Sequence, residues 1–150
     1  MIHNRLVLWG VNPTEMSKYT TVDERLKALH LKKEDREMLR HLEQIVVKQM
    51  GNEAPSVTYV AERMHVHPMK LLRMLKGSIG MTSVEYITFV RMRHALDYLK
   101  EYPRYSLAQV SLLCGYADNS HFTHVFQRWF ETSPQAYIGI RHTHADASEK

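Results

Sequence analysis

The chain has 150 residues and 44% of them are apolar, so it can enclose a modest core but not the large buried active site of a multidomain enzyme. Its 20 Lys and Arg outnumber its 16 Asp and Glu, and its 10 His add positive charge when protonated, which favours acidic partners. A single cysteine excludes an internal disulfide, and no apolar run can span a bilayer. These features predict a soluble cytoplasmic protein that makes no membrane contact.

Residues 1–37 have no sustained periodicity and are interpreted as an arm or linker. Within this region, Thr21 and Glu24 have the spacing of a capping box, in which each side chain satisfies a free backbone N–H group. Leucines follow them at helical distance, so a short helix is expected near residues 22–29. No function is assigned to the arm.

Three helices are predicted in the next part of the chain. Apolar side chains recur every three or four residues between Glu34 and Gly51, which is typical of an amphipathic helix. Ser56 opens a second, shorter helix, and Pro68 suits the first turn of a third because its missing N–H group costs nothing there. Two short helices separated by a tight turn are therefore expected over about 56–80.

The remaining elements are also predicted to be helices. Thr82 and Glu85 repeat the capping-box spacing and start a long helix over about 83–101. Ser106 and Gln109 have the same spacing and open a second pair of short helices, with a turn between them, over about 106–131. Ser133, a capping residue followed by proline, begins a last helical turn or two. The predicted fold class is therefore all-α.

The two helix-turn-helix segments are copies of one pattern. In both, the second helix has an outer face rich in His, Arg, Lys, Asn and Ser. A polar second helix behind a tight turn is typical of helix-turn-helix units, in which that helix enters the DNA major groove. Equivalent positions of the two copies differ by 50 in residue number before the turn and by 51 after it, because the second turn has one extra residue. The matched pairs are Val57 with Leu107, Val60 with Val110, Ala61 with Ser111, His65 with Gly115, Leu71 with Phe122, Met74 with Val125 and Leu75 with Phe126.

The second copy carries the more specific motif. Its run GYADNSHFTHVFQRWF at residues 115–130, with Ser133 and Pro134 after it, resembles the arabinose-regulator (AraC) family of bacterial transcription factors. The first copy, over residues 60–87, is similar to the first helix-turn-helix of the same family. The resemblance covers both copies and the long helix between them.

The resemblance implies an all-helical DNA-binding domain of about seven helices over residues 38–141, with a polar tail at 142–150. The long helix would hold two recognition helices about one DNA turn, roughly 34 Å, apart, so that the domain reads an asymmetric site in double-stranded promoter DNA. The family also suggests contact with RNA polymerase, no cofactor and no enzyme activity. Many members carry a sensor, receiver or dimerisation domain. This chain is therefore either a complete short regulator or, in the interpretation that we favour, the output part of a longer one. It would act at the nucleoid as an activator or a repressor.

In the first copy, the family motif places Arg73 toward the groove, where a guanidinium can donate two hydrogen bonds to guanine O6 and N7. Met69 and Leu72 cannot hydrogen-bond to bases, so apolar contact with thymine methyls is expected of them. A solvated or internally paired arginine is the alternative for Arg73. Phosphate contacts, or ordinary exposed positions, are expected of His67, Lys70 and Lys76, and His67 could instead cap the helix.

In the second copy, four polar residues at the start of the recognition helix are candidates for base contact: Asn119, Ser120, His121 and His124. Contacts with phosphate are expected of Thr123, Gln127 and Arg128. The opposite face is predicted to be core, and an aromatic platform for single-stranded nucleic acid is the alternative reading of its residues, Phe122, Val125, Phe126 and Trp129.

Two positions depart from the family pattern. His65 in the first turn and Glu131 after the second recognition helix stand where the family usually has glycine. Residues other than glycine adopt a positive φ less readily, although histidine tolerates it moderately well. Because the first recognition helix also carries apolar residues outward, we expect sequence reading to depend more on the second copy.

Two other classes of function compete with DNA binding. A metal site could draw on His121 and His124, which lie three residues apart on one helix, together with Cys114, His142 and His144. No third ligand of fixed geometry is evident, so no metal is assigned. A helical module that binds proteins and not DNA is the stronger alternative, and a lack of DNA affinity at low salt would favour it. No nucleophile with a base and an orienting residue is evident, since Cys114 is expected to be buried and inert.

Overall fold

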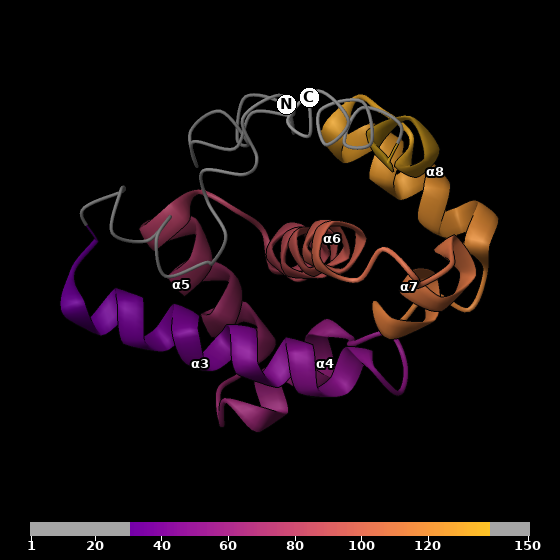
Figure 1. The fold of residues 1–150 in the computed structure, drawn as a ribbon. Coiled ribbons are helices and arrows are strands. Elements are labelled where there is room, and N and C mark those ends of the chain that lie inside the picture. The colour runs from indigo at the N-terminus through magenta and orange to yellow at the C-terminus, as the bar shows by residue number, and fades with distance from the viewer. Residues whose placement is uncertain (1–30, 139–150) are drawn as a thin grey trace.

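A computed structural model of the chain describes residues 31–138, and within that range every regular element is a helix (Figure 1). This confirms the predicted all-α fold class. The helix expected near 22–29 and the polar tail at 142–150 lie outside the described residues. The helices are α3 Lys33–Met50, α4 Val57–Arg63, α5 Pro68–Ile79, α6 Ser83–Glu101, α7 Leu107–Leu113 and α8 Asn119–Phe130, and residues 134–138 form a further short helix.

The boundary predicted at residue 37, between the arm and the DNA-binding domain, falls inside helix α3. The helix starts at Lys33, so residues 33–37, which were assigned to the arm, belong to it. Acidic Glu34 and Asp35 occupy its first turn, where carboxylates interact favourably with the helix dipole. This N-terminus has no side-chain cap, and the acidic residues of its first turn are the signal from which a helix starting at Glu34 was predicted, one residue after its actual start.

The other helices begin at capping residues, as the sequence predicted for four of them, including Ser133, whose hydroxyl accepts from the N–H group of Ala136 at 3.1 Å. Each N-cap side chain accepts a hydrogen bond from a backbone N–H group that has no partner within the helix. In α7 the cap is a complete capping box, because the Gln109 side chain also accepts from the backbone N–H group of Ser106 at 2.7 Å. The N-caps of α4 to α8 are Ser56, His67, Thr82, Ser106 and Asp118.

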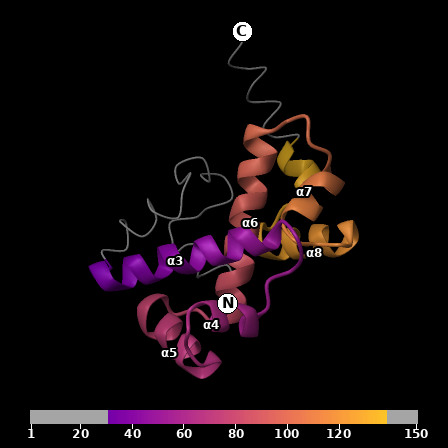
Figure 2. The same ribbon diagram turned by 90° about the horizontal axis from the view of Figure 1, so that it is seen from below.

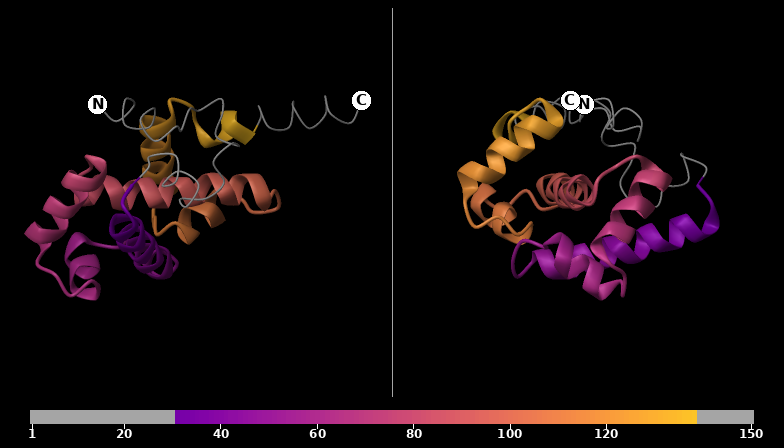
Figure 3. Two further views of the ribbon diagram at one scale, coloured as in Figure 1. Left: turned by 90° about the vertical axis from the view of Figure 1, so that its left-hand side faces the viewer. Right: turned by 180° about the vertical axis from the view of Figure 1, so that it is seen from behind.

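Helix α6 is the central element of the fold. Figure 1 shows it nearly end-on, with α5 on one side and α8 on the other. Figure 2 and the left panel of Figure 3 show α6 from the side, with α4 and α5 near its N-terminal end. Its buried residues include Phe89, Val90, Met92 and Leu96, so both helix-turn-helix units pack on one continuous core.

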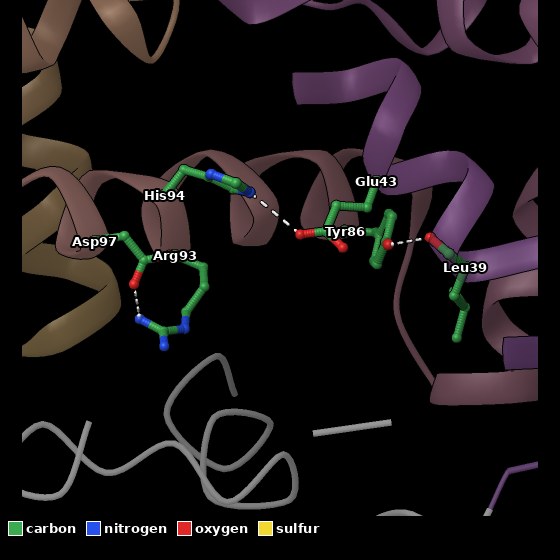
Figure 4. Close-up of polar contacts among 6 residues, drawn as sticks. All are labelled: Leu39, Glu43, Tyr86, Arg93, His94 and Asp97. Atoms are coloured by element: carbon green, nitrogen blue, oxygen red, sulfur yellow. Dashed lines mark hydrogen bonds and ion pairs between the residues drawn. The ribbon is translucent and has the colours of Figure 1, made fainter. Parts of the chain in front are cut away.

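Two polar contacts join α3 to α6 (Figure 4). The Tyr86 hydroxyl donates to the backbone carbonyl of Leu39 at 3.0 Å in the buried interface. His94 Nε2 lies 3.2 Å from Glu43 Oε1 in a half-buried pair. These contacts join the middle of α3 to α6. No helix between residues 31 and 138 combines the length and the apolar character needed to cross a membrane.

Candidate nucleic-acid interface

In the first helix-turn-helix unit, two backbone hydrogen bonds close the turn between α4 and α5. The N–H group of His65 donates to the Glu62 carbonyl at 3.1 Å, and that of Val66 donates to the Ala61 carbonyl at 3.1 Å. His65 has a φ of 58°, in the left-handed region that favours glycine. Its exposed side chain therefore occupies a position whose backbone conformation costs free energy.

The second unit closes its turn between α7 and α8 with the same two hydrogen bonds. The N–H group of Gly115 donates to the Leu112 carbonyl at 3.0 Å, and that of Tyr116 donates to the Ser111 carbonyl at 2.9 Å. Gly115 has a φ of 83°. All four positions are 50 residues beyond their counterparts in the first turn, which confirms the repeat inferred from the sequence.

Both recognition helices also begin alike, now at an offset of 51. His67 Nδ1 accepts from the N–H group of Met69 at 3.1 Å, and Asp118 Oδ1 accepts from that of Ser120 at 2.8 Å. The capping role that the sequence left open for His67 is thus present. An imidazole accepts at Nδ1 only when it is neutral and carries its proton on Nε2, so His67 keeps one free donor at Nε2.

The two recognition helices end in the same conformation. Gly80, after α5, has a φ of 69°, and Glu131, after α8, has a φ of 58°. In each case the N–H group of this residue donates to a carbonyl four residues earlier, which satisfies one of the free carbonyls of the last turn. Glu131 therefore adopts the backbone conformation of the glycine that the family usually has there.

Helix α5 presents most of the residues predicted for DNA contact to solvent. Its inner side buries Leu71, Leu75 and Ile79. Arg73 is exposed and makes no ion pair with any residue in the described part of the chain. Leu72 is half-buried, and the exposed candidates are His67, Met69, Lys70, Arg73 and Lys76. Residues 69, 73 and 76 follow the three- and four-residue spacing of one helix face.

Helix α8 divides in the same way. The predicted core residues Phe122, Phe126 and Trp129 are buried, which confirms their assignment, but Val125 is only half-buried because it lies at the edge of the apolar face. Thr123 is half-buried as well. The exposed candidates are Asn119, Ser120, His121, His124, Gln127 and Arg128. Positions 120, 124 and 127 share one face by helical spacing.

The charges of these two helices suit a polyanion. Neither α5 nor α8 contains an acidic residue, whereas α3 and α6 each contain several. Exposed Lys70, Arg73 and Lys76 make α5 cationic, and Arg128 gives α8 a positive charge at all relevant pH values. Helices without acidic residues limit repulsion with phosphate, and their cationic side chains allow counterion release on binding.

No part of residues 31–138 brings together three or more His, Cys, Asp or Glu side chains in a way that could hold a metal ion. His142 and His144 lie outside the described residues. Cys114 is fully buried, and burial raises the pKa of its thiol to about 12, despite the opposing effect of Arg91. The thiol is therefore neutral at physiological pH and is a poor nucleophile and metal ligand.

The residue that holds the second turn, Arg91, is not among the residues predicted from the sequence. Arg91 of α6 donates from Nε to the Cys114 carbonyl at 2.8 Å and from Nη2 to the Gly115 carbonyl at 3.0 Å. Its guanidinium carbon lies 3.7 Å from the centre of the Tyr116 ring. Burial lowers the pKa of Arg91, although Tyr116 and Cys114 oppose the shift. An arginine on the same helical face as buried Ile87 and Ala95 was the available signal, but its partners are distant in the sequence.

The second turn also packs against the loop after α3. A Cβ atom on Gly115 would lie 3.0 Å from the Met50 carbonyl oxygen and 3.3 Å from Ala54 Cα and from the Glu53 carbonyl oxygen. Glycine is thus required at this position both by its φ and by the close approach of backbone atoms. The turn of the second unit is fixed between α6 and the α3–α4 loop.

Comparisons with known proteins agree with this geometry. The family described as a helix-turn-helix domain matches residues 60–139. The chain is 34% identical over 87 residues to the HTH-type transcriptional activator RhaS of Yersinia pestis, a match that covers 56% of this chain and 30% of that protein. The chain therefore corresponds to less than a third of that relative's length.

Solved structures share the fold. The DNA-binding domain of the global transcriptional factor AdpA, solved with a target DNA, superposes with a TM-score of 0.62 at 21% identity, covering 71% of this chain and 94% of that one. An AraC-type transcriptional regulator from Chromobacterium violaceum superposes with a TM-score of 0.56 at 22% identity, covering 68% of this chain and 93% of that one. From the family match, with the paired turns and caps, the chain belongs to the AraC-type helix-turn-helix family.

Proposed function

We propose that this protein is a sequence-specific regulator of transcription that binds double-stranded DNA, with α5 and α8 each entering one segment of the major groove of a promoter. The observation that carries the proposal is the presence of two helix-turn-helix units with matching turns and caps on one central helix. Each unit exposes a second helix that lacks carboxylates. In helix-turn-helix proteins this second helix reads base edges.

Base reading is assigned to the outward residues near the start of each recognition helix. In α5, Arg73 would donate to guanine O6 and N7, because its guanidinium is exposed and has no ion-pair partner in residues 31–138. Met69 and Leu72 would contact thymine methyl groups. In α8, base contacts are assigned to Asn119, Ser120, His121 and His124.

Phosphate contacts supply affinity and orientation in this proposal. Lys70 and Lys76 lie three residues before and after Arg73 on α5, and both are exposed. His67 can serve as cap and phosphate ligand together, since Nδ1 accepts from Met69 while Nε2–H remains free to donate. In α8 the corresponding residues are Thr123, Gln127 and Arg128.

The partners of the whole protein follow from its relatives. The RhaS relatives are named transcriptional activators, and the matched region covers 30% of their length. We therefore propose that the chain acts as the DNA-binding part of a bacterial cytoplasmic regulator, with a sensor, receiver or dimerisation domain elsewhere in the protein and with RNA polymerase as a partner at the promoter. The proposal assigns no catalytic activity and no cofactor.

The test is selection of bound sequences from a random double-stranded library at about 150 mM salt, close to physiological ionic strength. The proposal predicts an asymmetric motif with two conserved segments about one helical turn, or about 10 bp, apart. A motif of half that length would mean that only one unit reads bases. No enrichment, together with no DNA affinity at low salt, would contradict the proposal and favour a module that binds proteins.

A further inference from the structure

The first turn of α8 contains a side chain that is exposed yet restrained. The ring of His121 lies 5.4 Å from that of Tyr116, at an angle of 73°, in an edge-on contact. His124, one turn further along the helix, has no ring contact within residues 31–138. A side chain that is already restrained loses less rotamer freedom when it binds a partner. His121 is thus better ordered for contact than its neighbour.

Tyr116 is itself fixed from several directions. It is only 4% exposed, and its ring lies 5.6 Å from that of Phe122. The Ser111 hydroxyl donates to its backbone carbonyl at 3.1 Å. The guanidinium carbon of Arg91 lies 3.7 Å from the centre of the Tyr116 ring, so the positive charge is attracted to the face of the ring.

Arg91 links these contacts to the central helix. Its two hydrogen bonds to the carbonyls of Cys114 and Gly115 hold the backbone just before Tyr116. A continuous series of contacts therefore runs from α6 through Arg91 and Tyr116 to His121 on the surface of α8. The first unit has no such series, because Val66 and Ala61 stand at the positions of Tyr116 and Ser111.

We propose that Arg91 and Tyr116 are positioning residues that hold the His121 ring in place to read one base pair. The inference rests on the proposed function, since it assigns a role within the DNA interface. The ring contact supplies the positioning, so Tyr116→Phe keeps it and Tyr116→Leu removes it while retaining apolar volume.

The test measures the ratio of Kd values for the selected operator and for an operator with a substitution at the base pair where His121→Ala reduces discrimination most. The wild type should prefer the selected base about tenfold, as expected for one good side-chain contact. Tyr116→Leu should reduce this preference about two- to tenfold, the range of an aromatic pair contact, and Tyr116→Phe should leave it unchanged. The base pair read by His124 is the matched control and should not respond.

A double-mutant cycle separates positioning from general loosening of the fold. Adding Tyr116→Leu to His121→Ala should cause no further loss of discrimination at this base pair, because the two changes act through one contact. A further loss there, or an equal loss at the base pair read by His124, would overturn the inference. If Tyr116→Leu does not fold, Arg91→Lys serves instead, since a lysine cannot donate to both carbonyls in a planar pair and stack on the ring.

Arg91→Lys should lower discrimination at the same base pair and preserve it in the part of the operator read by α5. Unchanged discrimination in Arg91→Lys would overturn the inference even though the operator is still bound. Failure of the wild type to select any operator would instead contradict the proposed function, and the inference with it.

Discussion

The two helix-turn-helix units have matching helix lengths, caps and turn hydrogen bonds but different cores. In α5 the buried positions are aliphatic, with Leu71, Leu75 and Ile79, whereas the equivalent positions of α8 carry Phe122, Phe126 and Phe130. The largest change is at Trp129, whose counterpart is Ser78. Caps and turn hydrogen bonds therefore specify this backbone, and cores of different volume are compatible with it.

The turns differ in what surrounds them. His65 is exposed to solvent, whereas Gly115 lies against backbone atoms of the α3–α4 loop and accepts a hydrogen bond from Arg91, which also donates to the carbonyl of the preceding Cys114. In the first unit a residue with a side chain thus occupies a position of positive φ. In the second unit the backbone of the α3–α4 loop lies too close to Gly115 to leave room for a side chain. We infer that the second unit has its orientation fixed more firmly by the rest of the domain.

The largest expected effect tests the difference between the cores. Trp129→Ala should lower the free energy of unfolding by about 3–5 kcal/mol, because it empties a buried aromatic site next to Phe89, 6.2 Å away between ring centres. Ser78→Ala, at the equivalent position, removes only a hydrogen bond to the Met74 carbonyl and should change stability by less than about 1 kcal/mol. Denaturant titration followed by circular dichroism measures both. Equal effects would contradict the comparison.

The next prediction compares the two turns. Substitutions at their positive-φ residues should change the free energy of unfolding in opposite directions. Gly115→Ala should destabilise the domain by about 2–4 kcal/mol, because it combines backbone strain with a clash against the Met50 carbonyl. His65→Gly should stabilise it by about 0.5–1 kcal/mol, since relief of the strained φ exceeds the added entropy of the unfolded chain. If both substitutions destabilise, the exposed turn is not strained as described.

A smaller effect, on binding and not on stability, compares the two reading surfaces. Arg73→Ala and His124→Ala should each weaken binding to the selected operator by about 1–3 kcal/mol and relax preference in different halves of the site. Both side chains are exposed, so melting temperatures should not change. Relaxed preference in the same half for both variants would show that the units do not read separate segments.

The smallest effect distinguishes phosphate contacts from base contacts. Lys76→Ala and Arg128→Ala should weaken binding to all sequences alike, and each should reduce the slope of log K against log salt by about 0.9. Fluorescence anisotropy over a series of salt concentrations measures the slope. A loss confined to particular base pairs would mean that these residues read sequence.

The repeat, the caps and most of the core could be predicted from the sequence because they depend on local spacing. Ser56 and Ser106 cap their helices as expected, and the extra residue in the second turn was placed correctly. Arg91 could not be predicted, because its carbonyl partners lie 23 and 24 residues away and nothing local identifies them. The contact between Gly115 and the loop after Met50 is likewise a tertiary feature.

The candidate site was predictable to the level of helix faces. Helical spacing separates inward from outward residues, so exposure of Arg73 and His124 follows from the pattern. Helical spacing does not determine how deeply a residue at the edge of a face is buried. Val125 and Leu72 lie at such edges and are half-buried. The contact between His121 and Tyr116 depends on the shape of the turn, which spacing does not encode.

The central claim is that α5 and α8 enter two separate segments of one duplex, and site-directed cleavage tests it most directly. The buried thiol of Cys114, with its pKa raised to about 12, should stay unlabelled, so Lys76→Cys and Gln127→Cys can each carry a DNA-cleaving iron chelate at equivalent exposed positions. Unsubstituted protein exposed to the same reagent is the control. We expect each variant to cut the operator at one centre, with the two centres about 10 bp apart. Cleavage at a single shared centre, or no defined cleavage by the Lys76→Cys variant, would contradict the account.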